Sequence, residues 1–260
     1  MQEYKGEISN SRIASHYTNV AASYNEAIFT QGDSEHQKWE LNHFLRHLRL
    51  QKTDRVVDLG CGTGIFTSAL YTKSGLADNI LGIDPSEEML RCARTLPGIT
   101  TRHTDGLSFT KDSTLRYDKI FMKGVVHHIP IASLPNLYHG IHQQLQPNGI
   151  LLVVTRPVEI DLPFFQAALD LWVELESPVV NGLSLIEKFG FSVSCYTYHR
   201  QVQVPKPQWF EMIQNRFWST FSHFDDTELK KGIEELEAKY TYTDILNFKD
   251  SLIFVESVRN

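Results

Sequence analysis

The stretch Val56–Gly64 has the sequence VVDLGCGTG, a short apolar run that leads into three glycines at alternate positions. This pattern predicts a buried strand followed by a tight turn, because glycine permits positive φ and lets the backbone approach a ligand. The glycines at 60, 62 and 64 differ from the G-x-G-x-x-G spacing of dinucleotide-binding folds. Asp58 lies two residues before the first glycine, where its carboxylate suits a cationic group and would repel a phosphate.

Two further acidic residues follow the next apolar runs along the chain. Asp84 comes directly after Ile80–Ile83, where a carboxylate can accept both hydroxyls of a ribose. Asp105 follows the run Ile99–His103 and is placed by chain order to reach the neighbouring part of a nucleoside. The order and spacing of these residues predict a nucleoside-binding site at the ends of adjacent strands.

The alternation of short apolar runs with helical stretches predicts an α/β fold with a parallel sheet wrapped by helices. Two helices are expected before it, over Ser11–Tyr24 and Ser34–Leu50. The predicted strands of the central part are Arg55–Leu59, Ile80–Ile83, Ile99–His103, Tyr117–Met122 and Ile150–Thr155.

The C-terminal part predicts a helical insertion between two long strands. A helix is expected over Leu162–Leu175, and strands over Phe191–Val204 and Ser251–Val258. The segment Pro207–Tyr240 between those strands has two helical patterns and is expected to act as a lid over a site. We expect residues 1–260 to form one domain, in which residues 1–50 supply N-terminal helices and residues 205–245 a helical cap.

Composition excludes several classes of function. The 25 Lys and Arg against 31 Asp and Glu give a formal net charge of −6, so we expect no nucleic-acid partner and no anionic membrane. No apolar run approaches the roughly 20 residues of a membrane span. The three cysteines form no C-x-x-C pair, which favours reduced thiols in the cytoplasm. His43 and His47 have no evident third ligand, so no metal is expected.

With these motifs the sequence resembles the class I S-adenosylmethionine-dependent methyltransferases, in particular the small-molecule group with a D-L-G-C-G-T-G loop. The resemblance implies a Rossmann-like mixed sheet of seven strands flanked by helices, with the last strand antiparallel, and S-adenosyl-L-methionine as cofactor. The cap looks like that of a branch that methylates small carboxylic acids such as trans-aconitate.

The resemblance also implies the roles of particular residues. The methionyl end of the cofactor would lie against Asp58 and the loop residues Gly60, Cys61, Gly62 and Gly64. Asp84 would bind the ribose, Asp105 with Gly106 the adenine amino group, and Pro85 and Met89 would pack beside the adenine. Tyr17 and Tyr24 would belong to an entry helix that closes over the cofactor. Lys123 departs from the small or polar residue common at its position, so its contact is expected through the backbone.

Other residues are candidates for acceptor chemistry. His127 and His128 follow the fourth strand and are predicted as catalytic bases, with His127 slightly ahead, against the alternative of a structural pair in which one ring is buried and hydrogen-bonded. Arg216 is a candidate to hold an anionic substrate, against a surface salt bridge, and Trp218 to line an apolar pocket, against a place in the core of the cap.

We therefore expect O- or N-methylation of a small molecule, possibly a carboxylic acid. The alternatives are a protein or nucleic-acid methyltransferase and a non-catalytic cofactor-binding regulatory module. The absence of an N-P-P-Y or D-P-P-Y sequence after the fourth strand argues against a nucleobase amine as acceptor. Acceptor identity, the methylated atom, the use of a catalytic base and oligomeric state stay open at this point.

Overall fold

The computed structural model describes residues 35–260 of the chain. The predicted helix Ser11–Tyr24, with the candidate residues Tyr17 and Tyr24, lies outside the described residues. The helix expected over Ser34–Leu50 is present as α2, Glu35–Leu48.

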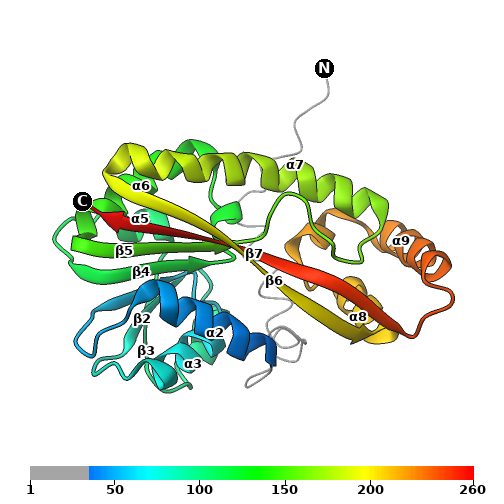
Figure 1. Cartoon of the computed structure of the whole chain (residues 1–260), viewed down its shortest axis with the longest axis horizontal. Coiled ribbons are helices and arrows are strands. Elements are labelled where there is room, and N and C mark those ends of the chain that lie inside the picture. Colours follow the sequence, from blue (N-terminus) through cyan, green and yellow to red (C-terminus); the bar gives the residue numbers. More distant parts are fainter. Residues whose placement is uncertain (1–34) are drawn as a thin grey trace.

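A mixed sheet of seven strands runs through the molecule in the order β3-β2-β1-β4-β5-β7-β6 (Figure 1). The first five strands are parallel, whereas β7 is antiparallel to both of its neighbours. The strand bounds are β1 Val56–Leu59, β2 Ile80–Asp84, β3 Ile99–His103, β4 Tyr117–Lys123, β5 Leu145–Thr155, β6 Phe191–Pro205 and β7 Ile245–Arg259. The predicted fold class, a Rossmann-like seven-stranded sheet with helices, is confirmed.

Helices cover both faces of the sheet (Figure 1). On one face α2 and α3, Ile65–Ser74, pack against the strands through Phe44, Leu70 and Phe121. The other face is covered by α5, Gly106–Thr110, α6, Leu134–Gln144, and the second half of α7, Gln166–Leu183. Helix α4, Glu87–Ala93, connects β2 to β3. Two buried apolar layers therefore hold the carboxyl ends of the parallel strands at one edge of the sheet.

Strands β6 and β7 continue beyond the sheet as a two-stranded ribbon that carries the cap (Figure 1). Strand β5 pairs with residues 253–258 of β7, whereas residues 245–252 pair only with β6. Between the two strands lie α8, Lys206–Gln214, the 3-10 helix η4, Ser219–His223, and α9, Asp226–Lys239. These helices and the ribbon enclose a third apolar cluster, centred on Trp209 and Phe164.

Several observed bounds differ from the predicted ones. Strand β7 starts at Ile245 rather than Ser251, because residues 245–250 alternate between exposed and buried positions and bury Leu246, Phe248 and Asp250. Helix α7 ends at Leu183, beyond the predicted end, and contains Pro178. That proline predicts a helix end because its nitrogen cannot donate a hydrogen bond, but burial of Val179 and Leu183 continues the helix past it. The prediction that residues 1–260 form one domain stays a prediction.

Helix α2 is fixed to the sheet by polar contacts as well as by its apolar face. His47 Nδ1 lies 2.8 Å from Oε2 of Glu256 on β7, and Arg49 Nη1 donates to Oε1 of the same residue over 2.8 Å. His47 Nε2 lies 3.0 Å from the hydroxyl of Tyr198 on β6. These contacts set the rotation of α2 about its axis, and thereby the side that it turns toward the ends of β1 and β4.

The cap core yields a test of the fold. Trp209 is fully buried, donates from Nε1 to the carbonyl oxygen of Pro163 over 2.8 Å, and packs on Phe248 with ring centroids 4.7 Å apart. We expect Trp209→Ala to lower the free energy of unfolding by about 3–5 kcal/mol, because it leaves a large cavity. Urea denaturation measures the change. Tyr242→Ala, at a fully exposed position, should cost less than about 0.5 kcal/mol, and equal effects would contradict the assigned packing.

Candidate functional site

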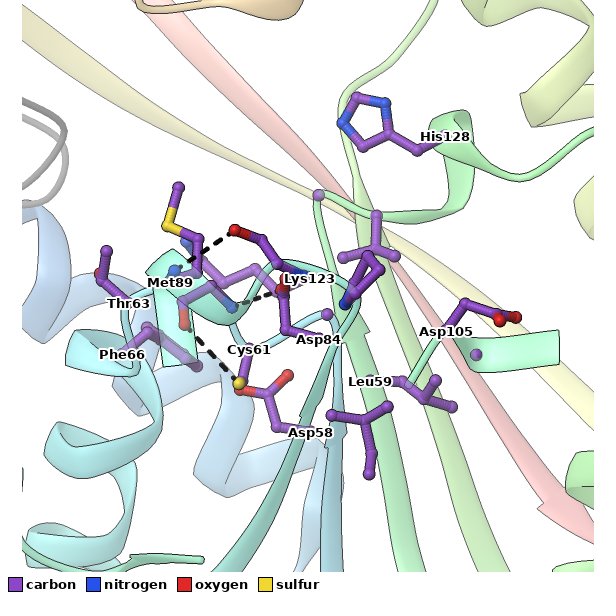
Figure 2. A pocket seen from close by; sticks show the side chains of 18 of the residues that line it. Asp58, Leu59, Cys61, Thr63, Phe66, Asp84, Met89, Asp105, Lys123 and His128 are labelled. Atoms are coloured by element: carbon purple, nitrogen blue, oxygen red, sulfur yellow. Dashed lines mark hydrogen bonds between the residues drawn. The ribbon is translucent and has the colours of Figure 1, made fainter. Parts of the chain in front are cut away.

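A cavity of about 400 Å³ opens at the carboxyl ends of β1, β2 and β4 (Figure 2). Its walls come from the glycine loop, the start of α4, the residues after β3, the 3-10 helix η1, Val126–His128, and α2. Ten of the predicted cofactor residues line it: Asp58, Gly60, Cys61, Gly62, Asp84, Pro85, Met89, Asp105, Gly106 and Lys123. Gly64 lies outside the lining and precedes α3, with φ of 77°.

The glycine loop, which follows β1, turns tightly because its three glycines adopt positive φ and its amides are hydrogen-bonded to the end of β2. Gly60 has φ of 88°, and its N–H and that of Cys61 donate to the carbonyl oxygen of Ile83 over 2.7 and 3.0 Å. A Cβ at Gly60 would lie 2.3 Å from a methyl of Val125, the residue that follows Gly124 after β4. The loop therefore needs glycine here both for its φ and for the close approach of the β4 loop.

The Asp84 carboxylate holds the loop in place. Its Oδ2 accepts from the N–H of Gly62 over 2.9 Å, and its Oδ1 from the N–H of Ser86 over 2.8 Å. Burial raises the pKa of Asp84, and these two hydrogen bonds oppose that change. Each oxygen has a further lone pair, so the carboxylate keeps acceptor capacity toward the cavity.

Asp58 is a deeply buried acid of the site. Its Oδ2 accepts from the hydroxyl of Thr67 over 2.5 Å, whereas Oδ1 has no hydrogen-bond partner among the described residues. Burial raises the pKa of Asp58 to about 7, and the Thr67 hydrogen bond and the charge of Lys123 oppose this. An unpaired oxygen beside a cavity suits a ligand that donates hydrogen bonds or carries positive charge.

Asp105 lies at another part of the cavity wall, beyond β3. It caps α5, because its Oδ1 accepts from the N–H of Ser108 over 2.8 Å. Burial raises the pKa of Asp105, but the hydrogen bonds from Ser108 outweigh burial and hold it below the usual value. Pro85, directly after β2, and Met89, in α4, add apolar surface to the same cavity.

Two charged residues from different elements meet in the cavity wall. Lys123 Nζ, at the end of β4, lies 3.1 Å from Oε2 of Glu40 on α2 and 4.8 Å from the ring centroid of Phe66. Burial raises the pKa of Glu40, but Lys123 and His36 outweigh it and lower the value to about 2. Glu40 is therefore ionised at neutral pH. The sequence predicted no role for Glu40 or Phe66.

The two candidate histidines differ in position. His128 lines the cavity and lies apart from Asp58 and Asp84 (Figure 2). His127 lies outside the lining, with its ring centroid 4.0 Å from that of His128 and its Nδ1 3.8 Å from Oε1 of Glu176 on α7. Burial, and then the charge of Arg156, lower the pKa of His127 to about 4, so its ring is neutral at pH 7.

Glu176 faces His127 in a buried polar pair beneath α7. Burial raises the pKa of Glu176 to about 7 although the charge of Arg156 opposes this, and its Oε2 has no partner among residues 35–260. At 3.8 Å, and with a neutral histidine, the pair is not a salt bridge at pH 7. The sequence predicted no role for this carboxyl group either.

The two candidate acceptor residues of the cap lie away from the cavity lining. Arg216 Nη2 donates to Oδ1 of Asp226 over 2.6 Å and to the carbonyl oxygen of Phe224 over 3.1 Å. Trp218 is 7 % exposed and packs on Trp209 and Phe164 in the core of the cap. These placements correspond to the structural alternatives, and the roles of the two residues in acceptor binding stay predictions.

One signal could have identified Glu40 from the sequence. Glu40 falls within the predicted helix, between the apolar residues Trp39 and Leu41, and four residues before Phe44. Spacing of three and four places Gln37, Glu40, Leu41 and Phe44 on one side of a helix. A carboxylate on the apolar side predicts a buried charge with a partner, although helix periodicity alone does not identify Lys123 as that partner.

Over residues 35–260, no group of three or more His, Cys, Asp or Glu side chains is arranged to hold a metal ion. No helix in this part of the chain combines the length and apolar character needed to cross a membrane.

Comparison with protein families identifies the central part of the chain. Residues 56–149 match the family model described as a methyltransferase domain. The chain carries a methyltransferase domain. The match confirms the predicted resemblance to the methyltransferases over this part of the chain. The matched range contains the glycine loop, Asp84, Asp105, Lys123 and the two candidate histidines, His127 and His128.

Individual relatives share this domain at low identity. The chain is 22 % identical over 173 residues to demethylmenaquinone methyltransferase of Staphylococcus epidermidis, covering 64 % of this chain and 69 % of the relative. It is 33 % identical over 112 residues to trans-aconitate 2-methyltransferase of Azoarcus sp., covering 42 % of each. Among solved structures, phosphoethanolamine N-methyltransferase 2 of Haemonchus contortus has a TM-score of 0.59 at 16 % identity, over 97 % of this chain and 60 % of that one.

Substitution of two glycines tests the contacts of the glycine loop. We expect Gly60→Ala to lower the free energy of unfolding by about 2 kcal/mol or more, because positive φ and overlap with Val125 both oppose a Cβ. Gly62→Ala should cost only about 1 kcal/mol, since φ is positive but no atom lies within 4 Å. Urea denaturation compares the two variants. Val125→Ala should recover part of the Gly60→Ala loss, and equal costs at both glycines would contradict the assigned contact.

The buried carboxyl group of Glu176 predicts a dependence of stability on pH. Its pKa is raised from 4.5 to about 7 in the folded chain. The stability that proton binding at this group contributes is therefore fully present below pH 4.5 and is lost as pH rises through 7. Glu176→Gln resembles the protonated form and should stabilise the protein at pH 8 by up to about 3 kcal/mol, with no gain at pH 4.5 or below. Denaturation at both pH values measures this. Glu174→Gln, exposed on the same helix, should change neither, and a pH-independent effect of Glu176→Gln would refute the assignment.

Proposed function

We propose that the cavity at the ends of β1, β2 and β4 binds S-adenosylmethionine, and that the enzyme transfers its methyl group to an oxygen or nitrogen atom of a small molecule. The observation that carries this proposal is the arrangement of three acids, Asp58, Asp84 and Asp105, around one cavity beside the glycine loop.

The residues of the cavity fit the cofactor chemically. Asp58 has a buried oxygen without a partner among the described residues, which matches an amino-acid ammonium. Asp84 retains acceptor capacity that matches two ribose hydroxyls. Gly62, in the cavity lining, leaves space that a side chain would fill, because no atom lies within 4 Å of the position of a Cβ. Asp105, with Pro85 and Met89, supplies an acceptor and apolar surface for the adenine.

The sulfonium of the bound cofactor supplies an activated methyl group, so the chain mainly has to orient the acceptor and exclude water. Burial of Asp58 and Asp84 supports a water-poor site. His128 lines the cavity apart from these acids, a position suited to the acceptor. If the acceptor is a hydroxyl or protonated amine, His128 can remove its proton, whereas a carboxylate needs no base.

Two observations support a small-molecule acceptor. The net charge of −6 gives no basic field for nucleic acid. The relatives described above are named as methyltransferases for demethylmenaquinone, trans-aconitate and phosphoethanolamine, which are small molecules. Because these compounds differ in chemistry, they support the size class of the acceptor rather than one compound.

Calorimetric titration with S-adenosylhomocysteine tests the cofactor site. We expect saturable binding to the wild-type protein and a loss of affinity of about 100-fold in Asp84→Asn, because two hydroxyl contacts to a carboxylate are weakened. Asp78→Asn makes the same chemical change at an exposed position before β2 and should bind as the wild type does. Unchanged affinity in a folded Asp84→Asn variant would refute the ribose assignment.

A further inference from the structure

Arg200 on β6 has a buried guanidinium nitrogen, Nη1, without a hydrogen-bond partner among residues 35–260. Its register partner on β7 is Asp250, whose side chain is 1 % exposed. The two oxygens of Asp250 accept from Nε and Nη2 of Arg156 instead, over 3.1 and 3.0 Å. A buried N–H donor without a partner is costly, so this position suits a ligand that accepts hydrogen bonds.

Arg200 lies on the face of the β6–β7 ribbon where the sheet meets the cap. Side chains alternate along a strand, so residues 198, 200 and 202 share one face. Tyr198 stacks on His43 of α2, with ring centroids 3.7 Å apart, whereas Val202 belongs to the apolar cluster of the cap around Trp209. Arg200 therefore lies between α2, which contributes to the lining of the cofactor cavity, and the core of the cap.

Polar side chains connect this position with His128 in the cavity wall. Arg156 directly follows β5, and its charge, after burial, lowers the pKa of His127, so its guanidinium lies near that ring. The His127 ring centroid is 4.0 Å from that of His128, which lines the cavity. The two histidines, Arg156 and Asp250 thus form a polar path past the end of β5 toward Arg200.

Charge and distance describe the group that Arg200 is suited to bind. Arg156 and Asp250 form a bidentate pair of opposite charges, so Arg200 adds a second cation beside an acid that is already paired. A guanidinium binds carboxylate and phosphate groups through two parallel hydrogen bonds. Strands β5 and β7 lie between β4 and β6, which separates β4 from β6 by about 14 Å. A ligand that reaches from His128 toward Arg200 therefore has its anionic group apart from the atom beside His128.

We propose that the methyl acceptor is a small anionic molecule, and that Arg200 binds its carboxylate or phosphate group while His128 lies beside the atom to be methylated. This inference rests on the proposed function, because it names the acceptor class of the same site. Arg200 is then a specificity residue. An anionic acceptor gains charge-assisted hydrogen bonds, whereas an acceptor without an anionic group leaves the buried Nη1 unpaired.

Two anionic probes and their counterparts without the anionic groups test this assignment. The protein saturated with S-adenosylhomocysteine is titrated in a calorimeter with phosphoethanolamine and trans-aconitate, and separately with ethanolamine and the trimethyl ester of trans-aconitate. We expect at least one anion to bind and neither counterpart to do so, and the anion that binds distinguishes phosphate from carboxylate. Arg200→Gln should weaken that binding by about 10- to 100-fold. Arg200→Lys keeps the charge and should lose less.

The matched control is Lys249→Gln, which also removes one positive charge from the ribbon, at an exposed position on its opposite face, and should leave anion binding unchanged. S-adenosylhomocysteine affinity should stay within about 3-fold in every variant, which verifies that each one is folded. Failure of both anions to bind, or equal losses in Arg200→Gln and Lys249→Gln, would overturn this inference alone. Failure of the wild-type protein to bind S-adenosylhomocysteine would overturn the proposed function as well.

Discussion

The hydrogen bond from the Gly62 amide to the Asp84 carboxylate is the constraint on which the site depends. It joins the loop after β1 to the end of β2, and the amides of Gly60 and Cys61 reinforce that connection through the carbonyl oxygen of Ile83. The loop then places Gly60 against Val125 after β4. The ends of three adjacent strands are therefore fixed relative to one another, and the cavity is the space that this arrangement leaves open.

Sequence predicted the strand ends well because short-range signals determine them. Glycine at alternate positions after an apolar run, and single acids after the next two strands, are local features whose meaning depends little on tertiary contacts. All three acids line the cavity. The alternation of strands and helices predicted the α/β class with a parallel sheet, and the family resemblance implied the seven-stranded mixed sheet that the structure has.

The structural features that the sequence did not predict depend on contacts between segments that are distant along the chain. Glu40 and Lys123 are separated by several elements, and helix periodicity places Glu40 on a buried side without naming its partner. The first half of β7 alternates between buried and exposed residues only because the cap packs on one of its faces. Glu176 is a residue of α7 that comes directly after the predicted end of that helix, so its proximity to His127 had no local signal. In each case, a tertiary partner decides what the local pattern leaves undetermined.

The ribbon formed by β6 and β7 also affects how the cap can move. Both strands are continuous from the sheet into the cap, with pairing unbroken from Phe191 and Arg259 to Pro205 and Ile245. Helix α7 extends over both parts as well (Figure 1). Any displacement of the cap must therefore bend or twist hydrogen-bonded elements rather than rotate about a loop. Such motion is elastic, since the distorted ribbon exerts a restoring force, and the resting orientation of the cap is set by the twist of two strands.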